Sequence, residues 1–502
     1  MPSFGVDVAG QFIDGQLQSV DLYICYNVNC GTAFFQTTMT PKMRKHPHVP
    51  TTFKRELSDW HLWTGRGVVI AFAALAGITV VAFTWLAEHA LAQFFTLQKA
   101  YWWGPLLWIP LSTSAIVWLT IRFAPGAAGS GIPQVMAALE PQATGLARGL
   151  YVSMKLTVAK VLLTTWGLLA GLSIGREGPS VQIAAGVMHH ARRWMPKRAH
   201  ISDHSLLIAG GAAGIAAAFN TPLGGVMFAI EELSKKEGQR SNSLVIVAIV
   251  VAGLMGVSAY GSASYFGVIR VQGLGIRLMF PALLLAVLCG LVGGIFSRLL
   301  IVSLTANSSD WFSTFRRNFP IAFAAGCGLA VAIIGVVSHG ETFGSGYAHN
   351  RAMLENTNDT SPLYVILKFV ATWLSTWAGV PAGVFAPSLA IGGALGNDIA
   401  QITSYANPPT LIALGMAGFL AAVTQAPLTA FIIVMEMVDG HALVMSLMAS
   451  ALVASGVSRL ISAPLYPTLA ELQLGRLSKS FSSEQKNSEA GQSPVAAPLR
   501  DK

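Results

Sequence analysis

The chain has 502 residues, of which 53% are hydrophobic and only 11% are charged. An average soluble domain carries roughly 25% charged residues, so this composition excludes an ordinary soluble protein and predicts one membrane unit. The formal net charge is +9. Because the basic residues stand in short loops beside apolar segments, they indicate membrane topology and no nucleic-acid partner.

Residues 1–60 are predicted to be an extension and a cytoplasmic segment before the membrane unit. They have neither the basic-then-apolar order of a signal peptide nor an apolar run long enough to span a bilayer. Cys25 and Cys30 form a single C-x4-C pair here, whereas Cys289 and Cys327 lie in apolar segments. This usage predicts neither a disulfide framework nor a metal site.

From Gly67 the chain is strongly apolar, and a series of spanning or half-spanning helices is predicted. Their ranges are 67–92, 103–123, 133–140, 149–172, 178–191, 206–218, 222–234, 243–262, 278–303, 318–337, 362–378, 386–401, 409–422, 427–438, 441–461 and 465–474. Several are shorter than the roughly 20 residues that a full crossing needs. Short apolar segments with Gly or Pro at their ends are typical of transporters with discontinuous helices.

The predicted fold class is therefore an all-α polytopic membrane protein with many tilted and half-spanning helices, over 61–476. Residues 477–502 are rich in Ser, Lys and Gln and are predicted to form a disordered tail. Basic clusters precede the first span and recur near 189–198, 235–240 and 316–317. The positive-inside tendency places these clusters, and with them the amino terminus, in the cytoplasm.

The two halves of the chain resemble each other. The matched residues are Pro222 with Pro427 and Glu231 with Glu436 at an offset of 205, Pro179-Ser180 with Pro387-Ser388 at 208, and Gly129-Ser130-Gly131 with Gly344-Ser345-Gly346 at 215. Because the order is kept and the drift is small, we predict two structural repeats, about 67–262 and 278–461, plus a final helix. Such repeats place a substrate site at their interface near the bilayer midplane.

Three motifs rich in Gly and Pro interrupt the apolar pattern, each before a helix. They are Gly129-Ser130-Gly131-Ile132-Pro133, Gly175-Arg176-Glu177-Gly178-Pro179 and Gly383-Val384-Phe385-Ala386-Pro387. Ser130 is a good N-cap, and Pro133 suits the first helical turn. Helix N-termini offer free N–H groups and roughly half a positive charge, so several converging ends would bind an anion. Simple helix breaking is the alternative for any one motif.

Glu177 is an acidic residue within this apolar region. A carboxylate inside the membrane costs about 2.5–3.5 kcal/mol and marks function by default. Because removal from water disfavours the ionised form, Glu177 could load and release a proton. Its carboxylate would also compete with an anion for the same helix ends. A structural ion pair with Arg176 is the alternative.

The motifs G-S-G-I-P, G-R-E-G-P and G-V-F-A-P, in this order, closely resemble the three signatures of the CLC family of chloride channels and chloride/proton antiporters. The resemblance runs from about Gly67 to about Leu474, and it is to the prokaryotic type without C-terminal CBS domains. It implies the CLC fold with two inverted-topology repeats, in a homodimer with one pore per subunit. It also implies a bacterial inner-membrane transporter with cytoplasmic termini, not an enzyme, that needs no cofactor and takes chloride and protons as substrates.

The resemblance also implies roles for single residues. Ser130 matches the serine whose hydroxyl contacts the central chloride, and serine in place of proline there suggests chloride over nitrate. Val384 and Phe385 match the residues whose backbone N–H groups hold the ion. Tyr466 matches the tyrosine whose hydroxyl donates to chloride. Glu177 matches the gating glutamate, which passes protons on the outer side.

Glu232 decides between the two mechanisms of the family. Antiporters carry a matching glutamate, taken as the inner entry point for protons, whereas many passive, voltage-gated channels have an apolar residue there. Within the internal repeat Glu231 pairs with Glu436 and Glu232 with Met437, so Glu231 and Glu436 look structural. A solvated residue at the cytoplasmic rim is the alternative for Glu232. The intact G-R-E-G-P argues against the fluoride-selective branches, and Lys160 either favours anions in the pore or snorkels to an interface.

Overall fold

The computed structural model describes residues 60–141, 148–196, 201–234, 243–261, 266, 276–305, 310–355 and 361–475. The predicted extension over 1–60, save its last residue, lies outside the described residues. So do Cys25, Cys30, the basic loop near 235–240 and the predicted tail over 477–502. The described part confirms the predicted all-α class, since its single β-type pairing is one isolated bridge.

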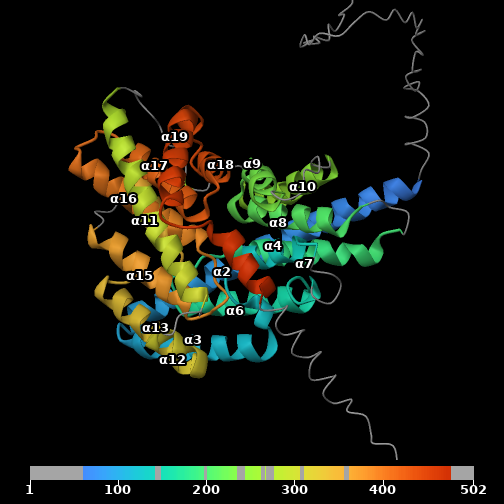
Figure 1. Ribbon diagram of the computed structural model, residues 1–502, viewed down its shortest axis with the longest axis horizontal. Coiled ribbons are helices and arrows are strands. Elements are labelled where there is room, and N and C mark those ends of the chain that lie inside the picture. Colours follow the sequence, from blue (N-terminus) through green and yellow to red (C-terminus); the bar gives the residue numbers. More distant parts are fainter. Residues whose placement is uncertain are drawn as a thin grey trace, which may run out of the picture. The chain divides into compact units, whose positions relative to one another are not determined.

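The helices follow the predicted order, and Figure 1 shows helices of the two halves side by side, with α3 of the first half next to α13 of the second. The first half holds α2 (Trp60–Ala100), α3 (Gly104–Phe123), α4 (Ile132–Leu139), α6 (Met154–Leu169), α7 (Glu177–His190), α8 (Asp203–Phe219), α9 (Pro222–Phe228) and α10 (Ser243–Tyr260). The second half holds α11 (Met279–Thr305), α12 (Trp311–Asn318), α13 (Pro320–Val337), α14 (Tyr347–Leu354), α15 (Leu363–Trp377), α16 (Phe385–Ile402), α17 (Pro408–Thr424), α18 (Pro427–Met437), α19 (Val444–Arg459) and a last helix over 465–475.

Three helices differ most from the prediction. Helix α2 has 41 residues, well beyond the predicted 67–92, and at a rise of 1.5 Å per residue it is about 60 Å long. It must tilt strongly to remain within a hydrocarbon core of about 30 Å. Helices α12 and α14 were not predicted, because each has only eight residues and includes polar and basic side chains that interrupt any apolar run.

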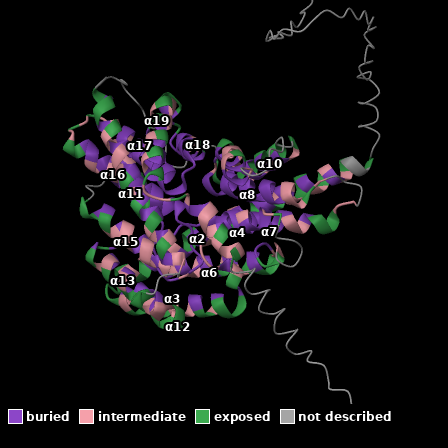
Figure 2. Cartoon of the chain, in the orientation of Figure 1, coloured by how far each residue is buried: buried purple, intermediate pink, exposed green. Residues whose placement is uncertain are grey.

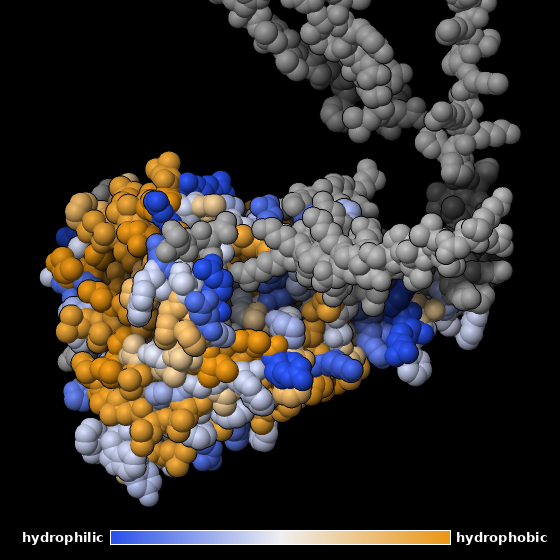
Figure 3. All heavy atoms as spheres, turned by 60° about the horizontal axis from the view of Figure 1, so that its bottom comes forward, coloured by the Kyte–Doolittle hydropathy of each residue, from blue (hydrophilic) through white to orange (hydrophobic). Residues whose placement is uncertain are grey.

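The described helices provide an apolar exterior around a tightly packed interior. Six of the described helices are long and apolar enough to cross a membrane, judged by length and composition: α2, α3, α10, α11, α13 and α19 with the turn before it. The face drawn in Figure 3 is largely hydrophobic. Large apolar side chains are exposed along α3 and α11, among them Leu111, Trp118 and Ile295. Apolar surface of this extent needs a bilayer or a partner to cover it.

Helices α8 and α17 form the centre of the packing, and they are almost wholly buried in Figure 2. Every residue of α8 from Leu206 to Phe219 and of α17 from Thr410 to Thr424 is buried. Small residues allow neighbouring backbones to approach closely. A Cβ on Gly214, for example, would lie 2.5 Å from the carbonyl oxygen of Ser180 on α7. Gly214 is therefore a packing position, where a larger residue would separate α8 from α7.

Two glutamates connect the halves in a reciprocal way. The Glu231 carboxylate accepts the backbone N–H groups of Leu428 and Thr429 at the start of α18, at 3.1 and 2.7 Å. The Glu436 carboxylate accepts those of residues 223 and 224 at the start of α9, at 3.1 and 2.8 Å. All partners are related by the offset of 205. The repeats thus meet as if about a two-fold axis, and the structural role predicted for Glu231 and Glu436 is confirmed.

Replacing Glu436 by alanine should lower the free energy of unfolding by about 2 kcal/mol. The change leaves two N–H groups at the start of α9 without their carboxylate, and hydrogen bonds to charged groups contribute about 1.5–3 kcal/mol. Thermal unfolding of the purified protein in detergent measures the loss. Glu355→Ala is the control, because its exposed ion pair with Arg351 should contribute under about 0.5 kcal/mol. Equal shifts for both variants would contradict the capping role.

Candidate anion and proton site

Backbone hydrogen bonds bring the three sequence motifs together. Gly175 and Gly383 exchange N–H···O bonds of 2.7 and 2.9 Å, so equivalent residues of the two repeats pair with each other. The Gly129 N–H donates to the Val380 carbonyl at 3.2 Å, and the Ala382 N–H donates to the Gly129 carbonyl at 3.1 Å. Segments more than 200 residues apart therefore form one continuous site.

Glycine is required at this junction because backbones approach each other too closely for a side chain. A Cβ on Gly383 would lie 2.9 Å from the Gly175 carbonyl oxygen and 3.0 Å from the Gly178 nitrogen. A Cβ on Gly178 would collide with the Ser130 hydroxyl oxygen. The second motif is thus held against both of the others, and three helix N-termini follow directly: α4 at Ile132, α7 at Glu177 and α16 at Phe385.

Ser130 is not the N-cap of α4, so that prediction was wrong. Gly131 caps the helix with a φ of 106°, a conformation that glycine adopts most readily. Its N–H donates to the Gln134 side-chain oxygen at 2.9 Å. Pro133 does lie in the first turn. The buried Ser130 hydroxyl, with the residue 9% exposed, is left with no hydrogen-bond partner among the described residues.

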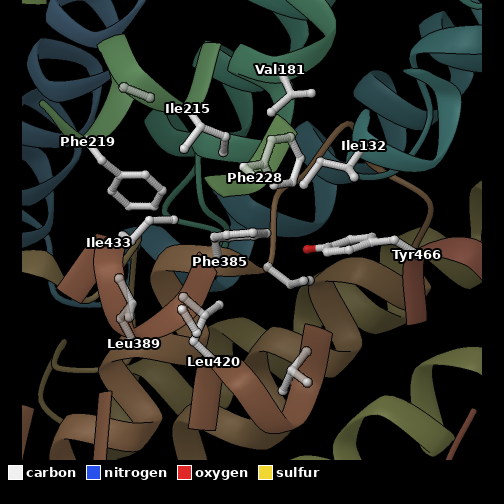
Figure 4. Close-up of a cluster of buried hydrophobic side chains, with 14 of the residues drawn as sticks. Ile132, Val181, Ile215, Phe219, Phe228, Phe385, Leu389, Leu420, Ile433 and Tyr466 are labelled. Carbon is white, nitrogen blue, oxygen red and sulfur yellow. The ribbon is translucent and has the colours of Figure 1, made fainter. Parts of the chain in front are cut away.

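Tyr466 is the second residue of the last helix, 465–475, and is 1% exposed. Its ring lies nearly parallel to that of Phe385, with centroids 5.9 Å apart. Figure 4 shows its hydroxyl directed into the cluster that includes Phe385, Phe228 and Ile132. Ser130 lies beside it, yet neither hydroxyl oxygen has a partner of hydrogen-bonding geometry within the described chain. Two such hydroxyls form the polar lining of an otherwise apolar site.

Glu177 is fully buried, and its carboxylate lies at the N-terminus of α16. Oε2 accepts the Ala386 N–H at 3.3 Å, and Oε1 accepts the Tyr347 hydroxyl at 3.0 Å. Arg176 Nε is 3.9 Å from Oε1, but its Nη1 lies 2.8 Å from Glu88 Oε1 on α2. Arg176 is therefore bound more closely by Glu88, and the carboxylate occupies a helix end of the kind that binds anions.

Tyr347 and the Ala386 N–H were not among the predicted site groups. Ala386 lies inside the third motif, but the prediction assigned the anion contacts to Val384 and Phe385, which the structure places as the N-cap and the first residue of α16. Tyr347 follows Gly344-Ser345-Gly346, the repeat of the first motif. That match could have drawn attention to Tyr347, because the first motif also ends at a helix N-terminus.

Glu232 lies in a short π-helical turn, Ala229–Leu233, that continues α9. The Ser234 N–H donates to the Ala229 carbonyl, five residues back, at 3.0 Å. Such turns are rare in proteins overall, but those that occur are often at functional sites. Helix α18, the equivalent of α9 in the second repeat, is α-helical throughout. Glu232 is only 2% exposed, which rules out a solvated position at the rim.

Lys160 is fully buried and does not snorkel to an interface. Its Nζ donates to two carbonyls of the loop before α4, at 2.8 and 2.6 Å, the second being that of Gly129. Lys368, 208 residues later, donates in the same way to two carbonyls of the loop before α14, at 2.9 and 2.7 Å. Each repeat thus holds its G-S-G loop with one buried ammonium group.

Comparisons with known proteins agree with this arrangement. The H(+)/Cl(−) exchange transporters ClcA of Citrobacter koseri and Salmonella paratyphi B are each 27% identical, covering 93% and 92% of this chain and 100% and 99% of their own length. A slow cyanobacterial Cl−/H+ antiporter superimposes with a TM-score of 0.67 at 25% identity, covering 82% of this chain and 98% of its own.

A CLC-type fluoride/proton antiporter, at 21% identity and a TM-score of 0.67, covers 80% of this chain and 96% of its own and shows the same fold. The sequence profile described as "Voltage gated chloride channel" matches residues 112–459. That range is more than half of the chain and includes all three motifs. Together with the fold and the converging helix ends, this match shows that the chain belongs to the CLC family of voltage-gated chloride channels and related transporters.

Proposed function

We propose that this protein exchanges chloride for protons across a bacterial inner membrane. The observation that carries the proposal is the position of Glu177, whose buried carboxylate accepts the Ala386 N–H at the start of α16. An anion drawn to the N-terminus of α16 would compete with the carboxylate for this helix end, so carboxylate and chloride would exclude each other there. The names of the bacterial ClcA relatives, which are H(+)/Cl(−) exchange transporters, support it.

The proposed chloride site lies between the helix ends and the two buried hydroxyls. Ser130 and Tyr466 would donate O–H groups to the ion, and the backbone N–H groups of Val384 and Phe385 would bind it from the N-terminus of α16. These contacts provide partial charges only. Partial charges suit transport, because an ion must leave as readily as it enters.

Protons would use Glu177 at one end of the path and Glu232 at the other. Both carboxylates are buried, and in this proposal the anion site lies between them. A proton would neutralise Glu177 and release it from the helix end, and chloride would then take its place. This exchange gives coupling without any cofactor, and no enzymatic step is part of it.

The assembly and orientation are proposed on the family resemblance. We propose a homodimer with one pore in each subunit and both termini in the cytoplasm. The apolar exterior of α3 and α11 offers surface for lipid or for a second subunit. Arg316 and Arg317, at the end of α12, support a cytoplasmic position for that helix.

Proteoliposomes with an imposed chloride gradient and no pH gradient test the proposed exchange. Protons that move against their own gradient in response to chloride would establish the antiporter. Chloride movement without proton movement would overturn it in favour of a passive channel. Protein-free liposomes measure the leak of both ions, and the proton signal must vanish when the chloride gradient is removed.

Ser130→Pro should raise the preference for nitrate over chloride by about fivefold. Proline removes the hydroxyl donor, and loss of one hydrogen bond of about 1 kcal/mol changes binding by roughly that factor. Nitrate is more weakly hydrated, so it depends less on that donor. Anion selectivity measured by competition flux tests the change. Ser345→Pro, at the equivalent position of the second repeat, is the control, and unaltered selectivity in Ser130→Pro would remove Ser130 from the site.

A further inference from the structure

We propose that Tyr347 is a positioning residue that latches the ionised Glu177 carboxylate onto the N-terminus of α16. The latch sets the balance between carboxylate and anion at that position. The proposal rests on the proposed role of Glu177 as the gate, and it assigns to that gate a partner on α14 that none of the three signature motifs contains.

The carboxylate is held at two points from two different elements. Tyr347, the first residue of α14, donates its hydroxyl to Oε1 at 3.0 Å, while the Ala386 N–H donates to Oε2 at 3.3 Å. Hydrogen bonds to an ionised acceptor are roughly twice as strong as those between neutral groups. Tyr347 therefore favours Glu177 in its ionised form at the helix end, and protonation of Glu177 weakens the latch.

The Tyr347 ring is itself held in place by its neighbours. The Arg176 guanidinium lies over the ring at 5.6 Å from its centroid, and the Phe266 ring is 5.5 Å away. Arg176 is in turn bound to Glu88 at 2.8 Å and to the Thr84 carbonyl at 3.2 Å, both on α2. A hydroxyl on a ring fixed from two sides loses little conformational entropy when it binds the carboxylate.

Tyr347 also stands between Glu177 and a cavity. A cavity of about 590 Å³ is lined by Tyr347 together with Glu88, Arg176, Glu341 and other residues of α2 and the loop before α14. Glu177 is not among the lining residues and is fully buried. A carboxylate that leaves the helix end toward this cavity must first break its bond to the Tyr347 hydroxyl.

The internal repeat shows that packing alone does not require a tyrosine here. Tyr347 and Ile132 are equivalent, because they follow the matched motifs Gly344-Ser345-Gly346 and Gly129-Ser130-Gly131 as first residues of α14 and α4. Ile132 is fully buried and apolar. The first residue of this helix therefore carries a hydroxyl only in the second repeat, where that hydroxyl binds Glu177.

Chloride binding to the purified full chain, measured by titration calorimetry, tests the latch. Tyr347→Phe should tighten the apparent affinity for chloride about tenfold, because the competing carboxylate loses one hydrogen bond to a charged group. Tyr364→Phe is the matched control, since this buried hydroxyl has no hydrogen-bond partner among the described residues, and its chloride affinity should not change. An unchanged affinity in Tyr347→Phe would overturn the proposal.

The same substitution in a Glu177→Ala background shows whether Tyr347 acts through the carboxylate. The latch predicts that Tyr347→Phe then has no effect on chloride affinity. An equal tenfold effect in that background would overturn it, because Tyr347 would then act on the anion directly. Neither measurement depends on proton movement. Absence of proton exchange in proteoliposomes would refute the proposed antiport alone, and absence of coupling between Tyr347 and Glu177 would refute the latch alone.

Discussion

Replacing Glu177 by alanine is expected to abolish proton movement while chloride continues to cross the membrane. The substitution removes the carboxylate that occupies the N-terminus of α16 through the Ala386 N–H. The helix end remains, so an anion can still bind there. Without a titratable group at this position, no proton is taken up when chloride leaves. Chloride flux should be equal to or faster than that of the unmodified chain.

Simultaneous recording of chloride efflux and proton uptake in proteoliposomes measures this result. Glu355→Ala provides the control, because this half-exposed carboxylate pairs with Arg351 at the protein surface, and coupling should be intact. Proton uptake that persists in Glu177→Ala would remove Glu177 from the proton path. Loss of chloride flux as well would indicate that the carboxylate supports the site and does not gate it.

Glu232→Gln is expected to stop proton movement and leave chloride flux in place. Glutamine keeps the size and polarity of the side chain but cannot release a proton. Glu232 is buried and is not part of the proposed chloride site, so the proposed anion contacts of Ser130 and Tyr466 should be unchanged. The expected effect is a loss of coupling as complete as that of Glu177→Ala, from the opposite end of the path.

The neighbouring residue offers a sharp control for this experiment. Glu231 accepts the N–H groups of Leu428 and Thr429, and the side-chain oxygen of a glutamine can still accept one of them. Glu231→Gln should therefore lower thermal stability modestly and leave coupling intact. If Glu232→Gln retained proton uptake and Glu231→Gln lost it, the inner proton site would move to Glu231, and the π-helical turn would have a different purpose.

Most helices could be predicted because apolar length and Gly or Pro boundaries are local properties. Helices α3 and α10 begin and end within two residues of the predicted ranges. Helices α12 and α14 could not be found in this way, because an eight-residue helix with polar side chains has no apolar signal of its own. The long α2 was underestimated because its ends continue past the apolar stretch, where tertiary packing and tilt sustain them.

The sequence by itself determined the membrane class, the two repeats, the three motifs and the two glutamates of the candidate site. The membrane class, the repeats, the motifs and Glu177 follow from composition, from spacing and from the cost of a carboxylate in an apolar segment, whereas Glu232 was singled out by the family resemblance. Only the tertiary structure decided that Gly131 and not Ser130 caps α4, that Glu231 and Glu436 cap each other's repeats, and that Tyr347 binds Glu177. For the Glu231, Glu436 and Tyr347 contacts the physical reason is distance along the chain: they join residues 170 or more positions apart, and such hydrogen bonds exist only once the repeats have packed against each other. The Gly131 cap is local, but its position requires glycine because the backbone packs against the Gly178 carbonyl.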